Sequence, residues 1–441
     1  MKMIGMLRIS LLLLGLGCSR QSSHEPVTLT FLDIEWDTPD QMPGLAQDLQ
    51  EFTRETGIRV KRIPRPDGSF NQLALWHELL QKGTGTPDVV SIDVIWSGVL
   101  NPYLMDLKPY FANELSSQNS VVAASYTVGD KLVAVPHHAY VGVLLYRPDL
   151  LRKYGYRDPP KTWDELEKMA TRIQAGERAK GEKDFWGYVW QGGIDEDLTC
   201  SSLEWQISDA GGRIIEDDKT ISVNNPRVIR AWQRAAHWVG SISPPGVVAY
   251  GKWDAQNVWG SGKAAFLRGW QSDYSLITRG WPFSESRSHR PSDTVTQFGI
   301  TSVPGGTARQ VSTLGGNGLA VSQTSAHPDE ALELIRFLLR RDVLITRAND
   351  HSEPPKEVEL YELPVILEPY PQQANSRQHW GDVVARPSII AGPKYEDVSR
   401  AYIEAVHSTL TGEKKPSVAA ADLEKELVAI TGFEKGPPKL D

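Results

Sequence analysis

The sequence has few cysteines, no long apolar segment and no concentration of basic residues. Two cysteines among 441 residues are too few for a disulfide framework or a zinc site built from cysteines. The strongest apolar run, residues 7–16, has about half of the roughly 20 residues that a membrane-spanning helix needs. The formal net charge of −8 argues against a nucleic-acid partner, because binding phosphates requires a concentrated basic surface.

Recognisable catalytic motifs are also missing. Gly260-Ser-Gly-Lys263 lacks the earlier glycine and the following Ser or Thr of a phosphate-binding loop, and no metalloprotease or nucleophile-elbow motif occurs. His137 and His138 are candidate metal ligands, but neighbouring residues on a strand point to opposite faces and no third ligand is evident. These motifs therefore supply no catalytic residue, and we expect no metal and no cofactor.

Carboxylates near strand ends leave one enzymatic alternative open. They are Asp33, Glu35, Asp37 and Asp93. Ligands bind at strand ends in open α/β sheets, and a pair of carboxylates can hydrolyse a glycoside. Carboxylates also accept hydrogen bonds from sugar hydroxyls in non-catalytic sites, so a glycosidase and a sugar-binding protein both remain possible at this point.

The N-terminus has the order of an export signal. Lys2 and Arg8 give a positive start, the apolar run follows, and small residues precede Cys18. The segment Leu-Gly-Leu-Gly-Cys resembles the bacterial lipobox, in which the cysteine is acylated; an ordinary secretory signal is the alternative. We predict a signal peptide over residues 1–17, a lipidated tether over 18–26, and an extracytoplasmic position at a bacterial membrane. Cys200 would then have no partner and should be a buried, reduced thiol.

Strand and helix patterns alternate along the chain. Residues 27–34, 58–63 and 87–95 are typical of strands, and residues 45–52 and 73–80 have helical spacing. Such alternation predicts a parallel sheet, and the chain length predicts two lobes. Further helices are predicted after the capping box at Thr162–Glu165, after Pro328, and at 229–236, 264–266, 394–410 and 418–430. A strand is predicted at 298–306.

Tryptophan is unusually frequent, with 14 residues. Any one of them favours a core position, but together they suggest a cleft in which rings stack on a ligand.

Six stretches, in order, resemble the family-1 extracellular solute-binding proteins of ABC sugar importers, most closely the trehalose/maltose-binding branch. They are residues 87–110, 132–166, 187–212, 259–270, 314–321 and 385–392, the last reading Ala-Arg-Pro-Ser-Ile-Ile-Ala-Gly. The resemblance implies an α/β, two-lobed periplasmic-binding-protein-like fold with a hinge (type II, maltose-binding-protein-like). It implies an N-terminal lobe of residues 27–138 plus 300–343 and a C-terminal lobe of 139–299 plus 344–441, with crossovers near 138–142, 298–301 and 341–346.

The resemblance also implies the ligand-binding residues. They are Asp37, Arg65, Asp93, Trp96, Tyr140, Trp270, Asn317 and Arg386, with Cys18 as the lipid attachment site. Asp93 and Trp96 would line the cleft from one lobe, Trp270 would stack from the other, and Arg386 would face hydroxyls. Close relatives often have an aromatic residue where Asn317 stands and an acid near Tyr140, so the ligand need not be trehalose or maltose.

The implied function is a sugar-binding lipoprotein, for a disaccharide or an oligosaccharide, that delivers its ligand to an ABC importer. Its partners would be the carbohydrate, the permease subunits with their cytoplasmic ATPase, and the membrane through the lipid; the protein would be a monomer. The alternatives are a secreted lipid-anchored glycosidase and a sensor that presents bound sugar to a membrane receptor.

Overall fold

The computed structural model describes residues 26–34, 44–66, 68–116, 119–273, 295, 297–348, 360, 363–368 and 376–439. Two predicted functional residues, Cys18 and Asp37, lie outside these ranges.

A mixed sheet runs through the molecule. Its strand order is β2 (Arg59–Ile63), β1 (Thr28–Leu32), β3 (Val89–Asp93), β11 (Ser312–Val321), β6 (Val135–Tyr146), β9 (Ala264–Trp270) and β7 (Trp186–Val189). At its sides β10 (Gly299–Ser302) pairs with β6, and β12 (Val383–Val384) pairs with β11. The strands at both ends are parallel to their neighbours, as in β1–β2, β1–β3 and β7–β9, whereas β11 is antiparallel to both β3 and β6.

The half of the molecule around β1–β3 contains the first part of the chain. Its helices are α1 (Gly44–Thr56), α2 (Ser69–Gln81), α3 (Ser97–Leu100), η1 (Asn101–Tyr103), α4 (Lys108–Ser116), α5 (Ser120–Ser125), α12 (Pro328–Leu338) and α13 (Arg341–Thr346), with a hairpin of β4 (Thr127–Val128) and β5 (Lys131–Leu132). The predicted parallel βα arrangement at the start of the chain is confirmed.

The other half surrounds β7 and β9. Its helices are α6 (Pro148–Lys153), α7 (Trp163–Arg178), α8 (Glu196–Ser208), α9 (Pro226–Trp238), η2 (Pro245–Ala249), α10 (Lys252–Gly260), α17 (Tyr395–Leu410) and α18 (Pro416–Thr431), and β8 (Thr220–Ile221) pairs with β13 (Glu434–Lys435). Shorter helices are α14 (Pro364–Leu367), α15 (Ser376–His379), α16 (Ser388–Ala391) and η6 (Gly392–Lys394). The predicted capping box of α7 is present: Thr162 Oγ1 accepts from the Glu165 amide at 3.2 Å.

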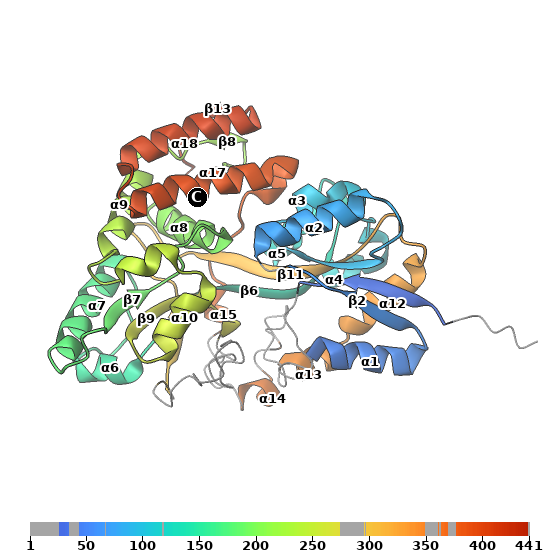
Figure 1. Cartoon of the computed structure of the whole chain (residues 1–441), viewed down its shortest axis with the longest axis horizontal. Coiled ribbons are helices and arrows are strands. Elements are labelled where there is room, and N and C mark those ends of the chain that lie inside the picture. Colours follow the sequence, from blue (N-terminus) through green and yellow to red (C-terminus); the bar gives the residue numbers. More distant parts are fainter. Residues whose placement is uncertain are drawn as a thin grey trace, which may run out of the picture.

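Two long strands connect the halves. Figure 1 shows β6 and β11 crossing from the half that holds α7–α10 to the half that holds α1–α5. The first predicted crossover lies within β6, the second overlaps β10, and the third coincides with α13. The exact residues at which one lobe gives way to the other stay a prediction.

One predicted element is wrong. Residues 264–266 begin the strand β9, not a helix, and β9 pairs with β6 on one side and β7 on the other. Every residue of β9 is buried. An apolar run that is covered on both faces has no polar period, so the sequence of this short segment does not distinguish a strand from a helix.

Most of the tryptophans belong to the core. In the half around β7, Trp163 and Trp205 each contact Trp238 at ring-centroid distances of 5.5 and 5.8 Å, and Trp190 lies 5.0 Å from Trp205. All four rings are fully buried. The idea that the tryptophans as a set line a cleft is therefore wrong; they form an interlocked aromatic core.

Cys200 lies in α8 and is buried and free, as expected. Burial raises the pKa of its thiol to about 12. Within the described ranges, none of the helices combines the length and apolar character needed to cross a membrane.

Candidate ligand-binding site

Four of the predicted site residues share one face of the sheet. They are Asp93, Asn317, Tyr140 and Trp270. Asp93 lies opposite Asn317, Gly315 lies opposite Tyr140, and Gly142 lies opposite Trp270. Residues that are directly opposite, or two apart on a strand, point to the same face. The pairing of β3, β11, β6 and β9 thus brings together residues that are far apart in the sequence.

A pair of aromatic rings lies on this face. Tyr140 and Trp270 meet edge to face, with ring centroids 5.3 Å apart. Gly315 makes this possible: a Cβ atom at this position would collide with the Tyr140 ring and would lie 3.0 Å from Trp270 Cζ3. Burial raises the pKa of Tyr140, so its hydroxyl stays neutral. The two rings offer an apolar face with a neutral hydroxyl beside it.

Trp270 is fixed by polar groups at both ends. Its indole N–H donates to Asp197 Oδ1 at 3.1 Å, and its backbone N–H donates to Asp273 Oδ2 at 2.7 Å. The ring also lies 4.2 Å from the guanidinium carbon of Arg268. Only 6% of the residue is exposed.

Below the rings lies a fully buried ion pair. Arg268 donates two hydrogen bonds to Glu204, at 2.7 and 3.2 Å, and neither residue is exposed. Thr313 donates both its backbone N–H and its hydroxyl to Glu204 Oε1. Burial opposes the charge of Arg268, but the Glu204 carboxylate outweighs it and raises the pKa of the guanidinium. This cluster joins β9, α8 and β11 beneath the site.

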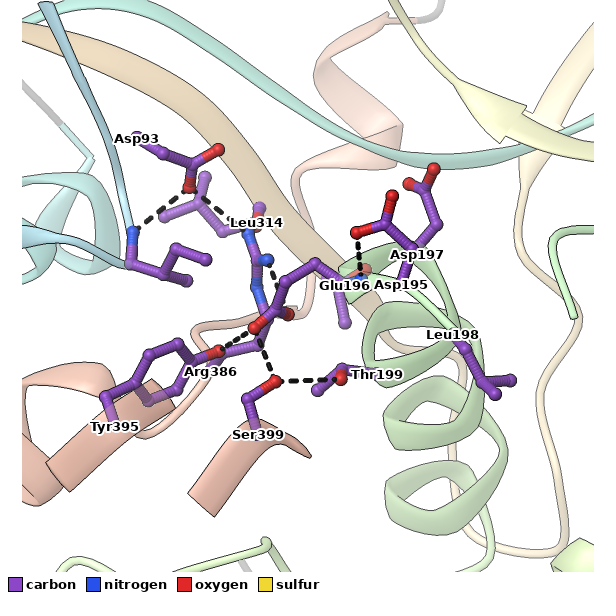
Figure 2. Close-up of polar contacts among 12 residues, drawn as sticks. Asp93, Asp195, Glu196, Asp197, Leu198, Thr199, Leu314, Arg386, Tyr395 and Ser399 are labelled. Carbon is purple, nitrogen blue, oxygen red and sulfur yellow. Dashed lines mark hydrogen bonds and ion pairs between the residues drawn. The ribbon is translucent and has the colours of Figure 1, made fainter. Parts of the chain in front are cut away.

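Arg386 forms a second cluster that links the two halves of the molecule. It donates to Glu196 Oε2 at 3.1 Å and to the Leu314 carbonyl at 3.3 Å, and it lies 3.7 Å from Asp93 Oδ1 (Figure 2). Glu196 also accepts hydrogen bonds from Tyr395 and Ser399, at 2.9 and 2.5 Å. The guanidinium is thereby held between β3 and the start of α8.

Three consecutive acids lie at the start of α8, with Asp195 as its N-cap, and none of them was among the predicted site residues. Asp195 caps the helix by accepting from the Glu196 amide at 2.7 Å, Glu196 binds Arg386, and Asp197 binds Trp270. Figure 2 shows the Asp195 and Asp197 side chains on the same side of the helix start. Consecutive acids directly before a helical apolar run are an N-terminal signature that could have drawn attention to them.

Two carboxyl groups of this site, those of Asp93 and Asp195, have raised pKa values. Burial raises the pKa of Asp93 to about 6, although Arg386 opposes the shift. Burial and the neighbouring Asp197 raise the pKa of Asp195 to about 6. Ionising these groups is therefore costly in this structure.

Two further predicted site residues are Trp96 and Arg65. Trp96 is 1% exposed and packs against Trp76 at a centroid distance of 5.5 Å. A role for Trp96 at the ligand stays a prediction. Arg65 follows β2, is half-buried, and donates to the neighbouring Pro66 carbonyl at 3.2 Å. A role for Arg65 in binding stays a prediction.

The expected geometry of the two histidines is wrong. The register between β6 and β11 shifts at Asn317/Gly318, so His137 is an extra residue in β6. The bulge re-aims the side chains, and the rings of His137 and His138 lie 4.0 Å apart. His137 Nε2 lies 3.2 Å from Arg347 Nη1, and no cluster of metal-ligating side chains occurs in the part of the chain that the structure describes.

Comparison with known proteins gives the family. Residues 35–343 match the family described as bacterial extracellular solute-binding protein. The chain belongs to this family. It is therefore a binding protein and not an enzyme, which agrees with the missing catalytic motifs and removes the glycosidase alternative.

Individual relatives agree. A probable ABC transporter-binding protein of Deinococcus radiodurans is 38% identical over 384 residues, 86% of this chain and 89% of the relative. The structure of maltose-bound MalE3 of T. maritima has a TM-score of 0.80 and 29% identity, covering 92% of this chain and 100% of that one. The GacH receptor of Streptomyces glaucescens, at 21% identity and a TM-score of 0.76, covers 93% and 100% and shows the shared fold. The predicted periplasmic-binding-protein fold is confirmed.

Proposed function

We propose that this solute-binding protein is a saccharide receptor of an ABC importer, for a disaccharide or an oligosaccharide, held at the membrane by lipid on Cys18. The observation that carries the proposal is the Tyr140–Trp270 ring pair beside Asp93, Asp197 and Arg386 on one face of the sheet. A sugar offers C–H faces that pack on aromatic rings and hydroxyls that need donors and acceptors, and this face supplies both.

The similarity to maltose-bound MalE3 supports a saccharide of the trehalose/maltose type, and the D. radiodurans relative supports an ABC permease as the partner. Asn317 and Tyr140, where close relatives often differ, are the positions at which we expect the specificity to diverge. We propose a monomer that closes about β6 and β11 when ligand is bound.

A saccharide screen tests the proposal. Mono-, di- and trisaccharides are added to the protein and the shift in melting temperature is measured, since ligand at a hundredfold excess over Kd adds roughly 2.7 kcal/mol to stability. Calorimetry then gives the affinity of the best ligand for the wild type and for Trp270→Ala. We expect the variant to bind about tenfold to a hundredfold more weakly, because it loses the stacking surface.

Trp186→Ala is the matched control. Trp186 is a half-buried ring in β7 that packs under Arg178 at 4.3 Å, away from the Tyr140–Trp270 pair. It should lose stability without losing affinity. If no saccharide binds the wild type, or if Trp270→Ala binds as tightly as the wild type, the proposed site is wrong.

The lipid anchor has a separate test. Expressed with its own N-terminus in a bacterial host, the wild-type protein should fractionate with membranes, and Cys18→Ser should be released as a soluble protein. Cys200→Ser, which removes the buried thiol, should stay with the membranes. Release of both variants, or of neither, would contradict an anchor at Cys18.

A further inference from the structure

The site of the Arg386 cluster contains more negative than positive groups. Four carboxylates surround Arg386: those of Asp93, Asp195, Glu196 and Asp197. Arg386 is the guanidinium that the described residues place against them. Two nearby cations are already paired elsewhere, Arg268 with Glu204 at 2.7 Å and Lys252 with Asp273 at 3.0 Å.

These carboxylates are unequally satisfied. Glu196 accepts from Arg386, Tyr395 and Ser399. Asp93 lies 3.7 Å from Arg386, beyond a hydrogen bond, and its other contact is the Ile95 amide at 3.1 Å. The contacts of Asp195 and Asp197 are with neutral donors, a backbone amide and an indole N–H. Asp93, Asp195 and Asp197 thus have no hydrogen bond from a cation among the described residues.

A second observation comes from the neighbouring strand. Asn317 is 7% exposed, and its Oδ1 atom has no hydrogen-bond partner among the described residues. It lies directly opposite Asp93 in the antiparallel register, so both side chains project from the same face. A buried acceptor without a donor costs free energy that a ligand carrying donors can recover.

Arg386 Nε is a buried donor without a partner among the described residues, but the other surplus groups are acceptors and negative charges. They lie beside the Tyr140 and Trp270 rings, and Arg268 already covers one side of the Trp270 ring. A neutral sugar would satisfy the acceptors but would leave the charge uncompensated. A protonated amine supplies three N–H donors for the acceptors and one positive charge to compensate the carboxylates.

We propose that the ligand is a cationic saccharide, a sugar that carries a protonated amine held against Asp93, Asp195 and Asp197. This inference rests on the proposed saccharide-binding function and names the substrate class of the same site. The raised pKa values of Asp93 and Asp195 in the ligand-free structure agree with it, because a bound cation would favour their ionised forms.

Matched pairs of sugars test the charge. Calorimetry at neutral pH compares trehalosamine with trehalose, and the disaccharide of β-1,4-linked glucosamine with cellobiose and with its N-acetylated form, which has no charge. We expect the amine to bind at least about tenfold more tightly in every pair that shows binding, and this advantage to shrink as salt is added. Equal or tighter binding of the neutral members would overturn the inference and leave a saccharide receptor; no binding by any sugar would contradict both.

Isosteric variants locate the effect. Asp195→Asn keeps a helix cap and Asp197→Asn keeps an acceptor for the Trp270 indole, so both should fold. Each should reduce the amine-to-neutral affinity ratio by about three- to tenfold, with a smaller change in neutral-sugar affinity. Asp130→Asn, in the exposed turn between β4 and β5, should leave the ratio unchanged. An unchanged ratio in both site variants would contradict the assignment of the cation to these carboxylates.

Discussion

Two arginine clusters lie on the same face of the sheet, and they differ in how completely their charges are matched. Arg268 faces Glu204 with two hydrogen bonds, and Thr313 supplies two more donors to the same carboxylate. Arg386 faces a larger group of acids, is hydrogen-bonded to Glu196, and lies 3.7 Å from Asp93. The first cluster is fully buried, whereas the Asp93 side chain in the second is 26% exposed.

The difference separates stability from binding. A buried charge must be paired, and the Arg268 cluster satisfies that condition within the protein. The Arg386 cluster leaves negative charge, the Asn317 acceptor and the Arg386 Nε donor without partners among the described residues. The Trp270 ring joins the two, since it lies over Arg268 and donates to Asp197 of the second cluster.

The largest expected effect comes from breaking the matched cluster. Arg268→Met removes the positive charge and leaves Glu204 buried without it, so the free energy of unfolding should fall by about 3 to 5 kcal/mol. Chemical denaturation measures it. Adding Glu204→Leu to this variant should recover much of the loss, because no unpaired charge then remains. A loss of less than about 1 kcal/mol in the single variant would show that the pair does not hold this region together.

The Arg386 cluster, in which negative charge exceeds positive charge, should make the free energy of unfolding depend on pH. The pKa values of Asp93 and Asp195 are about 6 in the folded protein, against an ordinary value of 3.8. The folded state therefore binds more protons between these values, and the free energy of unfolding should fall as pH rises from about 4 to about 6. The fall is at most about 3 kcal/mol per carboxyl, since one pKa unit corresponds to about 1.4 kcal/mol.

Denaturation across this pH range checks the prediction with the double variant Asp93→Asn/Asp195→Asn. In this variant the free energy of unfolding should no longer fall over this pH range, and the variant should be more stable than the wild type above pH 6. Asp218→Asn is the control, because a hydrogen bond from Lys439 lowers the pKa of that carboxyl and its effect has the opposite sign. If the double variant keeps the wild-type slope, other groups cause the pH dependence.

Sequence patterns could predict the local parts of this structure and not its long-range pairing. The βα alternation and the capping box at Thr162 depend on neighbouring residues, and both were predictable. The contact between Glu196 and Arg386 joins residues 190 positions apart, so no local pattern indicates it. The family resemblance supplied Arg386, Asp93 and Trp270, while the acids of α8 became visible only when the fold placed them beside these residues.

Two tryptophans with the same predicted role have different surroundings in the structure. Trp96 and Trp270 were both expected at the ligand. Trp96 is the N-cap residue of a short helix and packs on Trp76, whereas Trp270 ends a strand between the two arginine clusters. A tryptophan is equally suited to a core and to a sugar, and only its surroundings decide between these roles.

The smallest expected effect concerns the Tyr140–Trp270 ring pair, which lies where the two arginine clusters meet. Gly315→Ala places a Cβ atom against the Tyr140 ring and 3.0 Å from Trp270, so the ring pair must shift. Because the glycine touches neither ion pair, stability should fall by only about 1 to 3 kcal/mol. Saccharide affinity should fall too, since the stacking surface moves.

In the control Gly246→Ala the new Cβ makes ordinary contacts with Tyr250, at 3.5 Å or more, and both stability and affinity should stay near the wild type. Wild-type affinity in Gly315→Ala would show that the ligand does not depend on the Tyr140–Trp270 arrangement, and the difference between the two clusters would then rest on charge alone.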